Sequence, residues 1–285
     1  FKTFTDALKI RDAIWARLTA ETDNVIRIVI GGAGPTGVEL AGELAEWLCR
    51  ISHQRERECH VVISLVEAAP TILPGLDSRA IERVKKRLEG LGVSILTSCV
   101  IEKVIDHRVQ LQGGAPVPFD VLIWTGGTRA NRLAGALPLK TERRGHARVT
   151  SSLFCIPQTP DLKLGGRVYG VGDVTCFYDQ KTNKPVPGVA RAAISEASTA
   201  ARNIIRDMNG QKPLTYAAKD YPYIIPVGGK YAVVKVGPFV LSGFFAWVFK
   251  GLVELNYLIS VMPNMRAVKI WLQGFRTFVK NDRLG

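Results

Sequence analysis

The spacing of apolar residues divides the first half of the chain into alternating strands and helices. Four short apolar runs are typical of strands buried in a parallel sheet: residues 25–30, 61–66, 93–96 and 121–124. Two segments between them, 35–51 and 78–90, repeat apolar residues at helical spacing. Strands that alternate with helices in this order predict an α/β fold with a doubly wound, Rossmann-like parallel sheet.

The remaining elements are shorter or less regular. A helix is predicted over residues 1–22, and a small hairpin or meander over 99–112. Residues 131–167 are rich in loop-forming residues and poorly periodic. A strand is then predicted over 167–171, running into Gly172-Asp173, and a helix over 189–208.

The C-terminal part is more aromatic and contains two helical apolar stripes, from Leu241 to Leu258 and from Val268 to Phe278. Six cations lie between and beyond them: Lys250, Arg266, Lys269, Arg276, Lys280 and Arg283. Basic amphipathic helices with Trp and Phe bind anionic lipid at a membrane surface. The alternative is a helix pair packed on the protein or on a dimer partner. The longest charge-free run, 236–249, has fourteen residues, so a simple membrane span is not expected.

Charge and cysteine content limit the function classes. The 285 residues include 38 Lys and Arg against 25 Asp and Glu, a net charge of +13. This excess suits an anionic partner, either a dinucleotide or an acidic membrane. Nucleic acid is not expected, because the cations do not follow a recognised nucleic-acid-binding fold. Five scattered cysteines without a CxxC pair argue against a disulfide scaffold or a metal site and favour a reducing compartment.

A glycine-rich loop follows the first predicted strand. Gly32-x-Gly34-x-x-Gly37 lies between that strand and a helix, the setting that a dinucleotide-binding fingerprint requires. Gly32 permits the tight turn, Gly34 lets a diphosphate approach, and Gly37 lets helix and strand pack closely. Pro35 and Thr36 begin the helix, whose amide groups favour an anion, and Pro35 suits its first turn. The alternative is a glycine-rich turn without a ligand.

Glu67 ends the second strand and is the candidate ligand for the adenosine ribose. Its carboxylate can accept hydrogen bonds from both ribose hydroxyls and would repel a 2′-phosphate, so NADH is expected over NADPH. Glu67 lies thirty residues after Gly37, more than the usual ~20. The polar segment 50–60 can absorb this excess. The alternative for Glu67 is a surface acid at the end of a strand.

Glu39 and Glu43 lie four residues apart in the helix after the loop. Like charges at this spacing repel each other, although the helix dipole favours acids in the early turns. Glu39 is therefore a candidate for a role at the nicotinamide or in proton delivery. The alternative is a pair of ordinary N-terminal helix acids.

Four motifs in order suggest a family: GGAGPTGVELAGELAEW, LVEAAPTILPGL, VLIWTGG and VYGVGDV. Together they resemble the two-dinucleotide-binding flavoproteins, and most closely type II NADH:quinone oxidoreductase. The resemblance implies an NADH domain at 25–128, inserted in a split FAD domain made from 1–24 and 129–213. It also implies a C-terminal amphipathic helical region for membrane association at 214–285.

The same resemblance assigns further residues. Gly126 and Gly127 would contact the nucleotide, and Asp173 would hold the ribityl chain of FAD. The residues themselves support the second site, because Gly172 lets a cofactor approach the backbone and a helix N-terminus follows at Val189 and Ala190. The family usually carries two Gln at the start of this helix, whereas Arg191 and Ser195 stand here. Arg191 could stabilise a reduced anionic flavin or orient a different acceptor.

The FAD domain of such flavoproteins contains a second glycine-rich loop. No other G-x-G-x-x-G after a strand occurs in this sequence, and the sequence does not begin with Met. We therefore expect a chain truncated at its N-terminus; the alternative is a protein that cannot hold FAD tightly.

The predicted function is FAD-dependent oxidation of NADH with electron transfer to a membrane quinone. The expected location is peripheral, on the cytoplasmic face of the cell membrane or on an organellar inner membrane, and a homodimer remains open. Two alternatives are a soluble NADH-dependent flavin reductase with another acceptor and a non-catalytic, membrane-associated NADH-binding protein.

Overall fold

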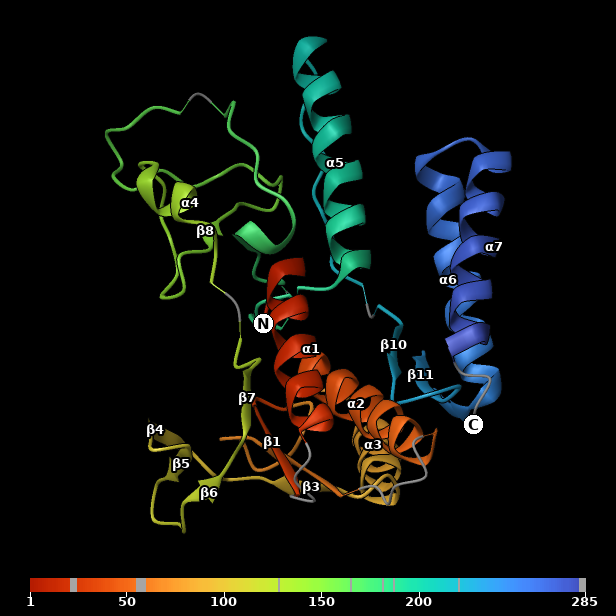
Figure 1. Ribbon diagram of the computed structural model, residues 1–285. Coiled ribbons are helices and arrows are strands. Elements are labelled where there is room, and N and C mark those ends of the chain that lie inside the picture. Colours follow the sequence, from red (N-terminus) through yellow and green to blue (C-terminus); the bar gives the residue numbers. More distant parts are fainter. Residues whose placement is uncertain are drawn as a thin grey trace. The chain divides into compact units, whose positions relative to one another are not determined.

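A computed structural model describes residues 1–20, 25–54, 60–127, 129–164, 166–180, 182–186, 188–219 and 221–281. The chain divides into two compact units (Figure 1). The first unit combines residues 1–127 with 222–285, and the second comprises residues 128–221.

A four-stranded parallel sheet forms the centre of the first unit. Its order is β3-β2-β1-β7, and its strands are β1 (Ile26–Gly31), β2 (Val61–Val66), β3 (Val93–Leu96) and β7 (Val121–Trp124). Ile28 pairs with Ile63 on one side and with Val121 on the other. β1, at the centre, is almost entirely buried, which explains its continuous apolar sequence. The four predicted strands and the Rossmann-like α/β fold are confirmed.

Three helices accompany this sheet: α1 (Phe4–Thr19), α2 (Pro35–Gln54) and α3 (Ser78–Gly90) (Figure 1). Thr3 and Asp6 form a capping box that fixes the start of α1. Ile14 of α1, Leu48 of α2 and Leu88 of α3 are fully buried in one apolar core with the strands. The helical periodicity in the sequence therefore reflects this shared core.

An antiparallel meander covers a second apolar cluster of the sheet. It consists of β4 (Ile101–Ile105), β5 (Arg108–Leu111) and β6 (Val117–Pro118). Val109 of β5 is buried with Val29 and Val66 of the parallel sheet. The hairpin or meander predicted at 99–112 is confirmed.

A second antiparallel sheet, which the sequence did not reveal, joins the C-terminal part to the first unit. Its strands are β10 (Tyr223–Pro226), β11 (Ala232–Val236) and β12 (Phe239–Gly243). Val227 and Val233 are fully buried in the same core as the parallel sheet. A Cβ atom on Gly42 of α2 would lie 2.8 Å from the backbone nitrogen of Gly228, so the two backbones cross in direct contact.

Two helices form a C-terminal hairpin, α6 (Phe244–Val261) and α7 (Asn264–Asn281) (Figure 1). The Trp271 indole donates a hydrogen bond of 2.7 Å to the carbonyl of Gly251 and joins the helices. By length and composition α6 could cross a membrane, with only 6% of its residues buried. Its two charged residues, Lys250 and Glu254, pair with each other across one turn.

The second unit has little regular structure besides α5 (Ala190–Met208). It also contains α4 (Arg132–Ala136), β8 (Ala147–Arg148), the 3₁₀ turn η1 (Gly172–Val174) and β9 (Thr175–Cys176). The helix predicted over 189–208 is confirmed, but the strand predicted at 167–171 is wrong. Only an isolated bridge between Phe154 and Tyr169 forms there. A strand forms only beside a partner with which it makes a continuous ladder, and the described pairing of this segment is limited to that bridge.

The cysteines differ from one another in state. Cys49 is disulfide-bonded, so at least one of the scattered cysteines is paired. Cys99, Cys155 and Cys176 are free. Within the described ranges no cluster of three or more His, Cys, Asp or Glu could hold a metal ion.

Candidate functional site

Gly32 and Gly37 make the turn after β1 possible. Gly32 has φ +103°, and a Cβ on it would lie 2.8 Å from the Cα of Gly126. A Cβ on Gly37 would lie only 1.9 Å from the carbonyl oxygen of Gly32. Both positions therefore exclude every other residue, for the reasons predicted from the fingerprint.

Gly34 faces open space instead. A Cβ there would meet no atom within 4 Å, so the absence of a side chain leaves the turn accessible rather than relieving a clash. Pro35 is the first residue of α2, and Pro35 and Thr36 are exposed beside this opening. The unpaired amide groups at the start of α2 can bind an anion there.

Glu67 lies against the same turn. One of its carboxylate oxygens accepts a hydrogen bond of 2.7 Å from the amide of Ala33, and the other accepts one of 2.9 Å from Ala69. Each carboxylate oxygen can accept further bonds, so these contacts leave capacity for a ligand hydroxyl. The structure thus brings Glu67 to the loop despite the long spacing in sequence.

The end of β7 completes this region. The Thr125 hydroxyl donates a hydrogen bond of 2.7 Å to the carbonyl of Gly32 and fixes the two strand ends together. Gly126 touches Gly32, and Gly127 has φ +89°. Gly126 and Gly127, predicted to contact the nucleotide, therefore lie next to the glycine turn. We refer to Gly32, Gly34, Gly37, Glu67 and these two glycines as the glycine-turn site.

Glu39 is half-buried in α2, and this burial raises its pKa to about 7. Lys250 of α6 opposes the rise, and Glu43 adds to it. A carboxyl group with this pKa exchanges its proton near neutral pH, as a group in proton delivery must. Lys250 could not be linked to Glu39 from sequence, since some two hundred positions separate them.

A separate cavity lies within the second unit, with a volume of about 320 Å³. Gly172, Asp173 and Val189, all predicted from sequence, line it together with Glu196. Its other lining residues are Arg144, His146, Thr175, Cys176, Phe177, Pro185, Val186, Gly188, Ala192 and Ala193. Ala190 and Arg191 are both exposed and are not among the lining residues, so the structure does not bring Arg191 to this cavity.

Side chains of Glu196, Thr175 and His146 contact the backbone of Gly172-Asp173, and the Thr175 amide also donates to the Gly172 carbonyl. The Gly172 amide donates to Glu196 at 2.7 Å, and the Thr175 hydroxyl donates to the Gly172 carbonyl at 2.8 Å. Nδ1 of His146 lies 2.8 Å from the Asp173 carbonyl oxygen. We call Gly172, Asp173 and their lining neighbours the Asp173 cavity. Glu196 was missed because an acid in a helix is usually a surface residue.

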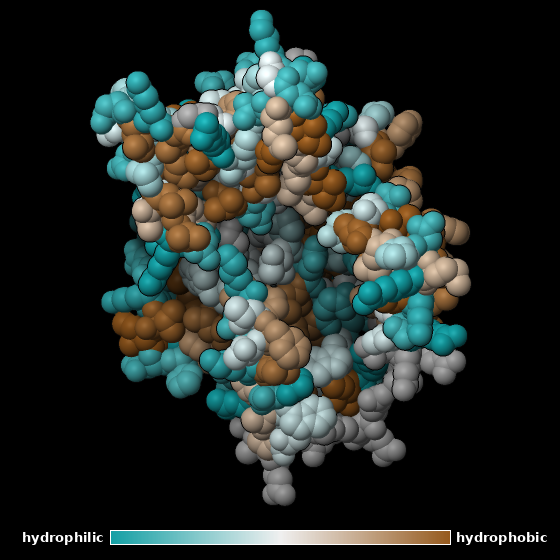
Figure 2. All heavy atoms as spheres, turned by 90° about the horizontal axis from the view of Figure 1, so that it is seen from above, coloured by the Kyte–Doolittle hydropathy of each residue, from teal (hydrophilic) through white to brown (hydrophobic). Residues whose placement is uncertain are grey.

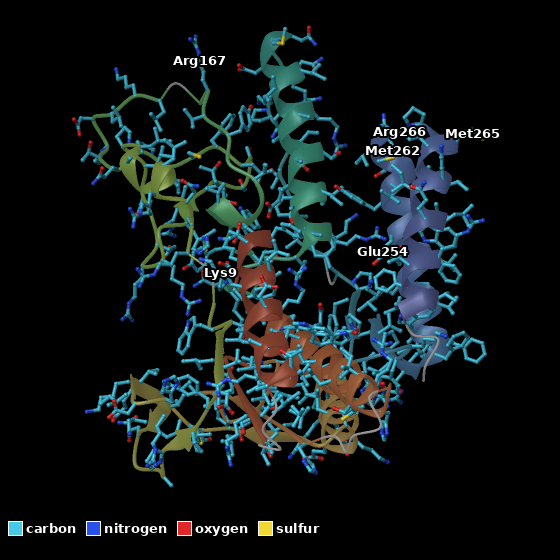
Figure 3. The ribbon with its side chains drawn as sticks, in the orientation of Figure 1. Lys9, Arg167, Glu254, Met262, Met265 and Arg266 are labelled. Atoms are coloured by element: carbon cyan, nitrogen blue, oxygen red, sulfur yellow. The ribbon has the colours of Figure 1, made fainter. Side chains whose placement is uncertain are left out.

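The α6–α7 hairpin carries apolar residues on its outside. Phe245 and Met265 are 85% and 87% exposed, and a cavity of about 310 Å³ lies between the helices, lined by residues including Trp247, Lys250 and Trp271. Figure 2 shows hydrophobic and hydrophilic side chains interspersed over this part of the molecule. Met262, Met265 and Arg266 lie where the two helices join, and Glu254 lies further along α6 (Figure 3).

Known proteins resemble this chain in sequence. Residues 1–197 match the pyridine nucleotide-disulphide oxidoreductase family. The type II NADH:quinone oxidoreductase Ndh of Mycobacterium tuberculosis is 28% identical over 96% of this chain and 61% of its own length. A type II NADH:quinone oxidoreductase of Staphylococcus aureus is 25% identical over 87% of this chain and 61% of its own length. The chain thus spans about 60% of the length of these curated relatives.

Solved structures show the same fold. NDH2 from Plasmodium falciparum, determined in complex with NADH, superposes with a TM-score of 0.77 at 16% identity and covers 95% of this chain and 72% of that one. A water-forming NADH oxidase from Lactobacillus brevis, bound to NADH, superposes with a TM-score of 0.59 at 15% identity, covering 82% and 45%. From its sequence match and its fold, the chain belongs to the pyridine nucleotide-disulphide oxidoreductase family.

Proposed function

We propose that this chain is part of a flavoenzyme that oxidises NADH and passes the electrons through FAD to a membrane quinone. The glycine-turn site carries the proposal, because a tight turn, an open Gly34, a helix start and an acid meet at one place. The type II NADH:quinone oxidoreductases among the relatives support the reaction and the acceptor.

NADH would bind at the glycine-turn site. Its diphosphate would lie over Gly34, where no side chain intervenes and the amide groups of α2 begin. Glu67 would accept hydrogen bonds from the adenosine ribose and disfavour a 2′-phosphate. Gly126 and Gly127 would allow the nucleotide to lie against the end of β7.

FAD would occupy the second unit at the Asp173 cavity, which fits part of such a group. The cavity is open, and no described hydrogen bond uses the Asp173 carboxylate, which can therefore accept one from a ribityl hydroxyl. When bound, FAD supplies the chemistry that accepts a hydride from NADH. The chain's contribution is to orient the cofactor and to stabilise charge at the start of α5, near Val189 and Ala190.

Glu39 would serve the proton balance of the reaction. Quinone reduction to quinol consumes one proton from solvent for each NADH oxidised. A half-buried carboxyl with a pKa of about 7 can bind that proton and release it at neutral pH.

The C-terminal hairpin would place the protein on an anionic membrane surface as a peripheral protein, on the cytoplasmic face or on an organellar inner membrane. Exposed apolar residues such as Phe245 and Met265 would enter the interface, and Arg266 and Lys269 would contact lipid phosphate. This placement would give quinone a route to the protein. A homodimer through the same apolar surface is a competing use of these residues.

A second function is favoured by one observation. Arg191 and Ser195 stand where the family usually has two Gln, and Arg191 is exposed. An exposed cation at that place suits an anionic or protein acceptor, as in a soluble NADH-dependent flavin reductase.

The test measures NADH binding by calorimetry and, with FAD added, NADH oxidation with a quinone analogue or with ferricyanide. We expect Gly34→Ala to weaken NADH binding, while the distant control Gly90→Ala, where a Cβ likewise meets no atom within 4 Å, does not. Turnover with quinone that exceeds turnover with ferricyanide supports the proposal. Undiminished NADH binding by Gly34→Ala would refute the nucleotide site.

A further inference from the structure

Glu196 is a buried acid for which the proposed reaction has no use. It lies in the second turn of α5 and is 5% exposed, although a charged side chain is rarely so buried without a specific partner. Its recorded hydrogen bond comes from the backbone amide of Gly172, at 2.7 Å. Both residues line the Asp173 cavity, so the contact belongs to the wall of that cavity.

The backbone at Gly172 needs an external partner. Gly172 has φ +69°, and a Cβ there would lie 3.4 Å from the Cβ of Ala193 on α5. The turn that follows, η1, is only three residues long and has no side-chain cap at its start. A 3₁₀ turn this short has few internal hydrogen bonds, so the Glu196 carboxylate supplies the one that ties it to α5.

This anchoring leaves the Asp173 carboxylate outside the hydrogen bonds that the structure describes for this turn. Glu196 holds the amide of Gly172, Thr175 holds its carbonyl, and His146 contacts the carbonyl of Asp173. The Asp173 side chain takes part in none of these contacts. Its Oδ1 would lie 3.1 Å from a Cβ on Gly188, so it faces a stretch of cavity wall that has no side chain.

We propose that Glu196 is a positioning residue: by binding the Gly172 amide it fixes the turn that directs the Asp173 carboxylate to a hydroxyl-bearing ligand in the cavity. This inference rests on the proposed flavin function, since the ribityl chain of FAD is the ligand with such hydroxyls. Glu196 itself does not contact the ligand in this arrangement.

The charged and titratable groups around Glu196 are consistent with a role of its side chain as a hydrogen-bond acceptor. Burial raises the pKa of Glu196, the Gly172 amide lowers it, and Asp173 raises it. Tyr216, whose hydroxyl lies 3.0 Å from that of Tyr221, also interacts electrostatically with Glu196. A neutral side chain that accepts the same hydrogen bond should therefore replace Glu196 without loss.

The test compares the length and the charge of the side chain at position 196 in the full chain. Glu196→Gln keeps an acceptor at the same reach but loses the charge, whereas Glu196→Asp keeps the charge but is one methylene shorter. Glu196→Ala removes both. Glu142→Gln is the matched control, because Glu142 pairs with Arg148 in the same unit and is not among the residues that line the cavity.

Two measurements are made: hydrogen exchange at the Gly172 amide, and FAD affinity by flavin fluorescence. We expect Asp and Ala at 196 to accelerate exchange and weaken FAD binding about tenfold or more. We expect Gln at 196 and the Glu142 control to stay within about threefold of wild type. If the Glu196→Ala variant loses the helical circular dichroism of the native protein, the comparison of Glu196→Gln with Glu196→Asp decides whether Glu196 anchors the turn.

Different failures separate the two proposals. Wild-type protein that does not bind FAD would overturn the flavin site, while faster Gly172 exchange in the Asp variant would still support the anchoring by Glu196. Unchanged exchange in the Asp and Ala variants would overturn the anchoring. An Asp variant that binds FAD normally, with a Gln variant that does not, would show that charge rather than reach matters and would also overturn it.

Discussion

Replacing Glu39 by Gln should stabilise the protein at neutral pH and above. Burial raises the pKa of Glu39 from 4.5 to about 7 in the folded state. Folded protein therefore binds this proton more tightly than unfolded protein does, and stability falls as the pH rises from about 4.5 to 7. At about 1.4 kcal/mol for each unit of pKa, the loss reaches at most about 3 kcal/mol. Gln at this position does not ionise, so Glu39→Gln removes this loss of folding stability.

The assay is urea unfolding at several pH values between 5 and 8, with Glu43→Gln as the control. We expect the stability difference between Glu39→Gln and wild type to be small at pH 5 and to grow to about 2–3 kcal/mol at pH 8. The Glu43 variant should show a smaller change. A difference that does not vary with pH, or that is largest at pH 5, would refute the burial argument for Glu39.

Three further predictions concern the turn, the ribose ligand and the hairpin. Gly37→Ala should destabilise the protein by about 3 kcal/mol or more, whereas Gly34→Ala should keep the wild-type melting temperature; equal melting temperatures for the two variants would contradict the geometry. Glu67→Ala should weaken NADH binding about tenfold in calorimetry and reduce the preference of the protein for NADH over NADPH. An unchanged preference would exclude Glu67 from the ribose site. Trp271→Phe should lower stability by about 1 kcal/mol in urea unfolding through the lost indole hydrogen bond; unchanged stability would mean that this bond contributes nothing.

Patterns that depend on local burial were predictable from sequence. Strands β1 and β2 are buried along most of their length and β3 and β7 in part, so their apolar runs identify them directly. The glycine turn was predictable for a similar reason, because each glycine in it meets a local steric or access requirement.

Features that depend on distant contacts were not predictable. The segment 167–171 has the composition of a strand, but a strand needs a partner, and here the described pairing is a single bridge at Tyr169. From sequence, Glu196 is expected to be a surface acid. Its role becomes evident only from the fold, which places Gly172 beside it. Lys250 influences Glu39 only because α6 and α2 belong to one unit.

The contact between Gly42 and Gly228 determines how the C-terminal sheet and hairpin can be handled experimentally. A methyl group on either glycine would collide with the backbone of the other, and the salt bridge between Arg87 and Glu46 lies beside this crossing. Removing residues 222–285 would take away the buried side chains of Val227 and Val233 and expose the core residues of the first unit that pack against them. Deletion of this tail would therefore destabilise the Rossmann core. The charge and the apolar surface of the hairpin are better altered by point substitutions on its outer face.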